Sequence, residues 1–223
     1  MKNNSELQTD VQNAIKWEPL LNAAEIGVTA KDGVVSLTGT VDSYAKKTEA
    51  ENAAKRVIGV KALVEKIEVQ FPNSWSKSDE EIANEALKAL KSNYSFPDDK
   101  VTVKVENGWL TLEGTLPWNY QKEEAKSCVN YLMGVKGVTN NISIKSDSHD
   151  TIEQKQVENA LARSLSVNDC DIQVSVTGTK VTLSGTVNSW YQKEEAGRIA
   201  WKTSGIWSVI NDLAVDYYYE LVG

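Results

Sequence analysis

The chain has 223 residues, of which 41% are hydrophobic and 25% are charged, and its formal net charge is −7. This composition is typical of a globular protein, and the acidic balance argues against a general nucleic-acid-binding function. All apolar runs are shorter than the roughly 20 residues that a membrane-spanning helix needs, and the two cysteines, Cys128 and Cys170, are too few for a disulfide framework.

The first 19 residues do not have the pattern of a secretory signal peptide. They contain no continuous apolar stretch and no small-residue cleavage site. We therefore expect a cytoplasmic location, or a periplasmic one if a leader has been removed from this sequence.

A stretch of twelve residues occurs three times. GTLPWNYQKEEA at 114–125 and GTVNSWYQKEEA at 185–196 agree at eight of twelve positions, and GTVDSYAKKTEA at 39–50 is a looser copy. Each copy begins with a glycine, and a second glycine follows twenty residues later: Gly39 and Gly59, Gly114 and Gly134, Gly185 and Gly205. Because the shared register extends over most of the chain, we predict three modules, at residues 1–71, 77–146 and 150–219.

Each module begins with the pattern of an amphipathic helix. Apolar residues recur at spacings of three and four, which place them on one face: Leu7, Val11, Ala14, Ile15; Ile82, Ala86, Leu87, Leu90; Val157, Ala160, Leu161, Leu165. Two strands of alternating apolar residues follow, at 26–30 and 35–37, 101–105 and 110–112, and 172–176 and 181–183. Asp32-Gly33 and Asn107-Gly108 suit type I′ hairpin turns, and Gly178-Thr179 is a weaker turn signal.

A second helix is expected to start within each repeated stretch, where Ser189 and Gln192 have the spacing of a capping box. We predict that it ends at the second glycine, and that a closing strand then contains Ile67, Ile142 or Leu213. The predicted fold class is α+β: three tandem modules of α-β-β-α-β, each a three-stranded mixed sheet with two helices packed on one face. Modules of about 65 residues are marginally stable alone, so we expect them to dock on one another.

These features resemble the BON domain, named for bacterial osmotically inducible and nodulation proteins. The resemblance rests on strand ends of the form LTGTV (37–41) and LSGTV (183–187) and on the closing segment GVKGVTNNI (134–142). It covers almost the whole chain, with departures at Leu116, Ile206 and Asp212, and with Lys66 where the second module has Asn141. The resemblance implies a bacterial protein that binds rather than catalyses, linked to osmotic or envelope stress, with phospholipid membranes as the family's usual proposed ligand.

The sequence offers little chemistry for an enzyme. Its one histidine, His149, lies in a polar stretch between modules, and no metalloprotease, CxxC or nucleotide-binding motif is present. We therefore predict no catalytic activity and no cofactor. Acidic residues before the first strand of two modules are possible cation ligands, although the same residues are good turn formers: Asp98, Asp99, Asp169, Asp171.

The aromatic residues are the most informative candidates for binding. Seven Trp and eight Tyr occur against two Phe, so most rings carry a polar group, as is favoured at interfaces. Those in the repeated stretches are the predicted ligand- or partner-binding residues: Tyr44, Trp118, Tyr120, Trp190, Tyr191. Some of these rings are alternatively expected to cap the cores or to pack on a neighbouring module.

We interpret the chain as a non-enzymatic scaffold that binds a protein partner or itself. Peripheral binding to phospholipid membranes, near Lys46-Lys47 or Lys122 and Lys126, is the alternative, and cation binding through the acidic loops is a weaker one. Residues 147–223 carry 6 basic and 11 acidic side chains, which disfavours an anionic membrane as the ligand of the third module.

Overall fold

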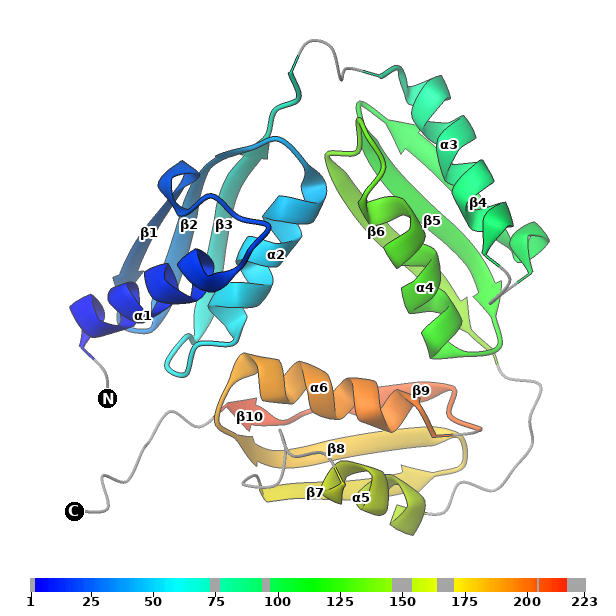
Figure 1. Cartoon of the computed structure of the whole chain (residues 1–223). Helices are drawn as coiled ribbons and strands as arrows, with labels where there is room; N and C mark the ends of the chain where they lie inside the picture. The colour runs from blue at the N-terminus through cyan, green and yellow to red at the C-terminus, as the bar shows by residue number, and fades with distance from the viewer. Residues whose placement is uncertain are drawn as a thin grey trace. The chain divides into compact units, whose positions relative to one another are not determined.

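The computed structural model describes residues 3–72, 77–93, 97–145, 154–163, 171–203 and 205–215, and it contains three α+β modules in chain order (Figure 1). His149, Asp169 and Cys170 lie outside these residues. By its internal packing the chain divides into two units: Met1–Thr40 with Thr48–Glu68 and Asp150–Gly223, and Val41–Lys47 with Val69–His149.

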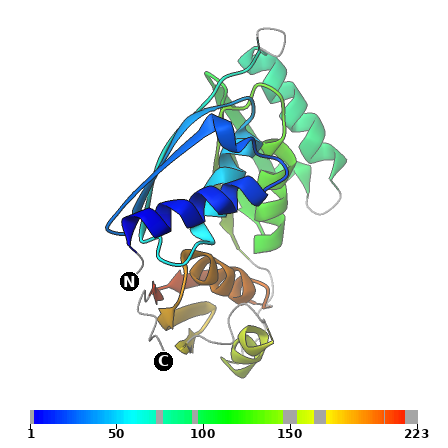
Figure 2. The same cartoon turned by 60° about the vertical axis from the view of Figure 1, so that its left-hand side comes forward.

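Module 1 has two helices and three strands: α1 (Asn4–Trp17), η1 (Ala23–Glu25), β1 (Ile26–Lys31), β2 (Val34–Val41), α2 (Tyr44–Lys55) and β3 (Ala62–Val69). Asn3 caps α1 in a capping box with Glu6. Leu7, Val11 and Ile15 form the buried face of α1, and both helices lie on the same side of the sheet (Figures 1 and 2).

Module 2 repeats this order: α3 (Asp79–Ser92), η3 (Asp98–Lys100), β4 (Val101–Glu106), β5 (Trp109–Leu116), α4 (Asn119–Asn130) and β6 (Gly137–Ile144). Ser78 and Glu81 form the capping box of α3. The buried face of α3 comprises Ile82, Ala86 and Leu90. Leu87 was predicted on the same face, but it is exposed, because it lies one position around the helix from Ala86.

Module 3 differs in its closing strand, which has two short parts: α5 (Gln154–Ala162), β7 (Asp171–Thr177), β8 (Lys180–Val187), α6 (Trp190–Trp201), β9 (Ser208–Asn211) and β10 (Ala214–Val215). Both β9 and β10 pair with β8 in parallel. Residues 212–213 interrupt the strand, and Leu213 there is buried in the core of the module.

The second strand of each module is central in its sheet, so each described sheet has β2, β5 or β8 in the middle. β1, β4 and β7 pair antiparallel with these strands, and β6 pairs in parallel with β5, so the sheets are mixed as predicted. The inward residues of the central strands are fully buried: Val35, Leu37, Leu110, Leu112, Val181, Leu183. Burial of each such side chain stabilises the fold by about 1.5–3 kcal/mol.

The first helix of a module also holds the hairpin turn. Asp79 Oδ2 and Oδ1 accept hydrogen bonds from the backbone N–H of Asn107 (2.7 Å) and Gly108 (2.8 Å). In module 1, Asn4 Oδ1 accepts from Asp32 N–H at 2.8 Å. Asp32 and Asn107 have φ of 52° and 54°, and the glycines after them also have positive φ, as a type I′ turn requires.

The second helices end earlier than predicted. α2, α4 and α6 end at Lys55, Asn130 and Trp201, four residues before the second glycine of each module. Backbone hydrogen bonds between residues three apart tighten these ends, such as Leu132 N–H to Val129 O at 3.2 Å. The glycines do have positive φ, of 106°, 91° and 83°, but they shape the turn toward the closing strand rather than cap the helix.

Candidate binding site

The predicted aromatic residues lie in three equivalent segments that join the second strand to the second helix. We call these segments, residues 42–48, 117–123 and 188–194, the elbows of modules 1, 2 and 3. Each elbow follows a strand end that is fixed by the first glycine of the repeated stretch. A Cβ atom on Gly114 would be 2.0 Å from the carbonyl oxygen of Lys100, so no side chain fits there.

The helix caps differ among the elbows. Ser189 Oγ accepts from Gln192 N–H at 3.2 Å, while Gln192 Oε1 accepts from the N–H of Asn188, one residue before the cap, at 2.7 Å. Of the two hydrogen bonds of the predicted capping box, the one from Gln192 N–H to the Ser189 side chain is present. The other, accepted by the Gln192 side chain, comes from the N–H of Asn188 instead of that of Ser189. Trp118 occupies the N-cap of α4 and makes no capping bond through its side chain.

In module 1, Tyr44 is the first residue of α2 and is half-buried. Its ring packs against the hydrophobic core cluster of module 2, which contains Leu110, Leu112 and Val129. The segment Val41–Lys47 belongs to the same structural unit as module 2, in agreement with this packing. Tyr44 therefore already has a packing partner within the chain.

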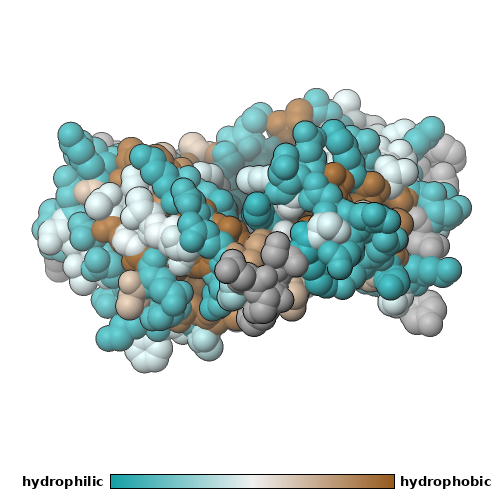
Figure 3. Space-filling view, turned by 90° about the horizontal axis from the view of Figure 1, so that it is seen from above, coloured by the Kyte–Doolittle hydropathy of each residue, from teal (hydrophilic) through white to brown (hydrophobic). Residues whose placement is uncertain are grey.

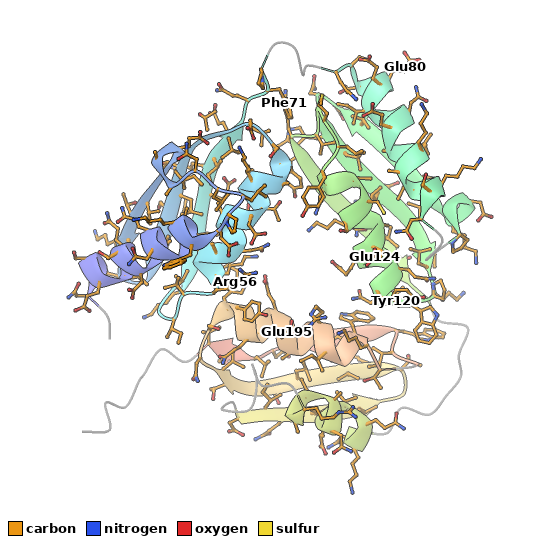
Figure 4. The ribbon with its side chains drawn as sticks, viewed as in Figure 1. Arg56, Phe71, Glu80, Tyr120, Glu124 and Glu195 are labelled. Carbon is orange, nitrogen blue, oxygen red and sulfur yellow. The ribbon has the colours of Figure 1, made fainter. Side chains whose placement is uncertain are left out.

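In module 2 the elbow presents an open aromatic ring. Tyr120 lies in the first turn of α4, and 53% of its surface is exposed (Figure 4). Trp118 is half-buried just before it. Beside Trp118, two lysines line a shallow pocket together with Thr115 and Pro117: Lys100 and Lys145.

In module 3 the elbow lies against the end of α2 from module 1, in the same structural unit. Lys55 Nζ is 2.9 Å from Glu194 Oε1 and 5.4 Å from the centre of the Trp190 ring. The guanidinium carbon of Arg56 is 5.7 Å from the centre of the Tyr191 ring. Both distances are within the range of cation–π interactions.

Next to this elbow, an ion pair between Glu195 and Arg198 shifts the pKa values of both side chains. The hydrogen bond from Arg198 holds the pKa of Glu195 below its usual value, and the same bond raises the pKa of Arg198. Arg198 Nε lies 2.6 Å from Glu195 Oε2, so the two side chains form an ion pair one turn apart on α6. Arg56 and Glu195, labelled in Figure 4, line one small pocket with Tyr191 and Arg198.

The described acidic candidates for cation binding lie at or just before the first strands of modules 2 and 3. Asp98 and Asp99 belong to η3, where Asp99 is exposed, and Asp171 is the exposed first residue of β7. Among the described residues there is no group of three or more His, Cys, Asp or Glu side chains suited to a metal ion.

Sequence reasoning missed two exposed aromatic rings outside the elbows, Trp109 and Tyr131. Trp109, the first residue of β5, is 53% exposed, and a Cβ on Gly137 would contact its ring. Trp17 at the end of α1 and Tyr131 after α4 are more exposed, at 84% and 73%. Trp109 was detectable, because it occupies the outward register of a strand whose inward residues are Leu110 and Leu112.

The surface offers no large apolar face in the view of Figure 3, where hydrophobic residues form small patches among hydrophilic ones. Within the part of the chain that the structure describes, no helix combines the length and apolar character needed to cross a bilayer.

A family model described as BON domain matches three segments of the chain, residues 3–70, 78–146 and 149–217. The chain is 28% identical over 145 residues to osmotically-inducible protein Y of Escherichia coli strain K12, an alignment that covers 63% of this chain and 72% of that protein.

Two solved structures of CdsD, a structural protein of the type III secretion system of Chlamydia trachomatis, also align. The first, of its C-terminal domain, is 19% identical with a TM-score of 0.26 and covers 96% of this chain and 98% of that chain. The second is 20% identical with a TM-score of 0.23 and covers 93% and 91%. Alignments with TM-scores this low establish nothing about shared structure or function.

Proposed function

The chain belongs to the BON-domain family over all three of its modules, and on this basis we propose that it is a non-enzymatic scaffold that binds a protein partner or itself. The relative named for osmotic induction supports a role in osmotic stress. The observation that carries the proposal is the elbow of module 2, where Tyr120 presents an exposed ring next to the half-buried Trp118.

Tyr120 suits contact with a protein surface for physical reasons. A tyrosine ring buries a large apolar area while its hydroxyl keeps a hydrogen-bond partner, and it loses little conformational entropy on binding. Tyr191, at the equivalent position of module 3, and Tyr44, in the elbow of module 1, already contact protein groups. The module 2 elbow is built from the same repeated parts, which supports protein binding as its use.

The test compares the full chain with Trp118→Ala/Tyr120→Ala and with Trp17→Ala, a control that removes an exposed ring outside the elbows. Light scattering over a range of concentrations measures self-association, and retention on the immobilised chain measures binding of other proteins. We expect the elbow variant to lose association at least about tenfold, since central aromatic contacts each contribute about 2 kcal/mol or more. Trp17→Ala should associate like the wild type. Equal association of all three proteins would contradict the proposal.

Phospholipid binding is the second candidate. It is favoured by Lys100 and Lys145, which line one pocket beside Pro117 in the module 2 elbow. Each lysine near an anionic membrane contributes about 1 kcal/mol. Flotation with anionic vesicles at low salt distinguishes the candidates: co-migration that is lost in Lys100→Ala/Lys145→Ala supports lipid, whereas its absence in the wild type excludes it.

A further inference from the structure

The module 3 elbow presents a carboxylate and aromatic rings to the basic residues at the end of α2. On the elbow, Trp190 and Glu194 are four residues apart and therefore lie on one face of α6. Lys55 satisfies both at once, through its ion pair with Glu194 at 2.9 Å and its position 5.4 Å from the Trp190 ring centre. A single ammonium group thus bridges a carboxylate and an aromatic face.

The second cation is held in position by its own module. Arg56 Nη1 lies 2.7 Å from Glu18 Oε1 and 3.7 Å from Glu49 Oε1, both in module 1. These ion pairs orient the guanidinium, whose planar face suits stacking on an aromatic ring. Arg56 therefore presents an already ordered group to Tyr191, which reduces the entropy lost on contact.

The basic residues that contact the module 3 elbow occur only in module 1. When the repeated glycines are aligned, the positions of Lys55 and Arg56 are Asn130 and Tyr131 in module 2, and Trp201 and Lys202 in module 3. The adjacent Lys-Arg pair is thus specific to module 1.

The elbow side is equally specific. The positions of Trp190, Tyr191 and Glu194 are held in the other modules by these residues: Tyr44, Ala45 and Thr48; Asn119, Tyr120 and Glu123. Of the three elbows, only that of module 3 therefore has two adjacent aromatic residues followed one helical turn later by a carboxylate.

From this complementarity we propose that the module 3 elbow is a docking site for a helix end that carries Lys-Arg, and that Lys55 and Arg56 of the same chain are its resident occupant. The site takes a cationic helix C-terminus, which is also the end where the helix dipole favours basic residues. The proposal extends the proposed function by giving one elbow a partner of defined chemistry.

The docking depends on ionic strength. The exposed fractions of the Lys55 and Glu194 side chains are 20% and 48%, so dissolved ions reach the ion pair. The screening length falls from about 30 Å at 0.01 M salt to about 3 Å at 1 M. Rising salt therefore weakens the contact of Lys55 with Glu194.

Zero-length carbodiimide coupling of the full chain, read by mass spectrometry, tests the docking directly. The reagent joins an amine to a carboxylate in contact, so we expect a Lys55–Glu194 amide at low salt. Its yield should fall about fivefold or more at 1 M salt, where the screening length is about 3 Å. The ion pair of Lys77 with Glu85 inside module 2 is the control for reagent efficiency.

Charge exchange provides the matched variants. Lys55→Glu should abolish the product, and Lys55→Glu/Glu194→Lys should restore a coupled pair at these positions. A second arm adds a peptide of residues 44–58 to the Lys55→Ala/Arg56→Ala chain; it should bind, and the same peptide with both basic residues replaced by alanine should not.

Absence of the Lys55–Glu194 product at low salt, with the control pair coupled, overturns the proposal, as does a yield that salt does not change. The experiment reports on the contact between the end of α2 and the module 3 elbow, and it does not involve the module 2 elbow. A failure here leaves the association test on Trp118 and Tyr120 unaffected, so the two proposals fail separately.

Discussion

Glycine at the end of each central strand is required by the closeness of the neighbouring strand. Gly39, Gly114 and Gly185 have φ of 136°, 143° and 111°, and a Cβ on each would lie 2.0 Å from a carbonyl oxygen at or just before the start of the first strand. The first glycine of the repeated stretch is thus explained by packing within one module, whereas the rings that follow it vary among the modules.

We predict that Gly114→Ala destabilises the chain by at least about 3 kcal/mol, at the upper end of single-substitution effects. The reason is that backbone must move to relieve the contact. Gly178→Ala is the control: its Cβ meets nothing within 4 Å, although its φ is 60°, so it should cost only about 1–2 kcal/mol. Chemical denaturation measures both. Equal losses would show that φ, rather than the close approach, requires the glycine.

A second prediction concerns the capping box that Ser78 and Glu81 form at the start of α3. The backbone hydrogen bond from Ser78, followed by that from its side chain, holds the pKa of Glu81 below its usual value. Ser78→Ala should destabilise the chain by about 1 kcal/mol at neutral pH. Ser92→Ala, at the other end of α3, is the control, because its hydroxyl only donates to Lys88 O within the helix.

The pH dependence follows from the direction of this shift. Because the folded-state pKa of Glu81 is lowered, its stabilisation is present above the unfolded pKa and is lost as pH falls through the folded pKa. The difference in unfolding free energy between wild type and Ser78→Ala should therefore shrink in acid. A difference that stays constant with pH would show that the Ser78 hydroxyl, which donates to Glu81 Oε2 at 3.0 Å, does not help to lower the pKa of Glu81.

At the scale of elements, an asparagine joins the closing strand to the second helix. Asn140 Nδ2 donates to Lys122 O at 2.8 Å, and Asn211 Nδ2 donates to Lys193 O at 2.6 Å. Module 1 has Glu65 at the equivalent position, where the carboxylate accepts from the N–H of Ile67. In modules 2 and 3 this bond gives a carbonyl in the first turns of α4 and α6 an additional donor from the closing strand.

We predict that Asn140→Ala lowers the free energy of unfolding by about 0.5–1.5 kcal/mol, because the side-chain hydrogen bond from the closing strand to the Lys122 carbonyl is lost. The neighbouring Asn141 is exposed, and Asn141→Ala should change stability by less than about 0.5 kcal/mol. Thermal unfolding of the two variants provides the comparison. If they unfold alike, the strand-to-helix bond does not stabilise module 2.

Periodicity was sufficient to predict the sheets, since alternation placed Val35, Leu110 and Val181 on the buried face, and they are fully buried. It did not predict where α4 ends, because that depends on backbone hydrogen bonds such as Leu132 to Val129. The elbow rings were identified from sequence, but their neighbours were not: Lys55 and Glu194 are 139 residues apart, and no local pattern connects them.

At the scale of the whole molecule, the modules use similar elbows in different ways. Tyr44 packs on the module 2 core, Tyr191 lies beside Arg56, and Tyr120 remains 53% exposed. The three elbows therefore occupy equivalent places in their modules, and the different side chains that they carry have different neighbours. Of the three elbows, we propose that the one in module 2 binds protein.

The most direct test places a photoreactive phenylalanine analogue at Tyr120 or, as control, at Trp17, and identifies what each position cross-links in living bacteria. We predict that position 120 yields adducts with protein, either a second copy of the chain or another polypeptide, and that position 17 does not. Adducts of position 120 with lipid alone, or no more protein adducts at position 120 than at position 17, would contradict protein binding by the module 2 elbow.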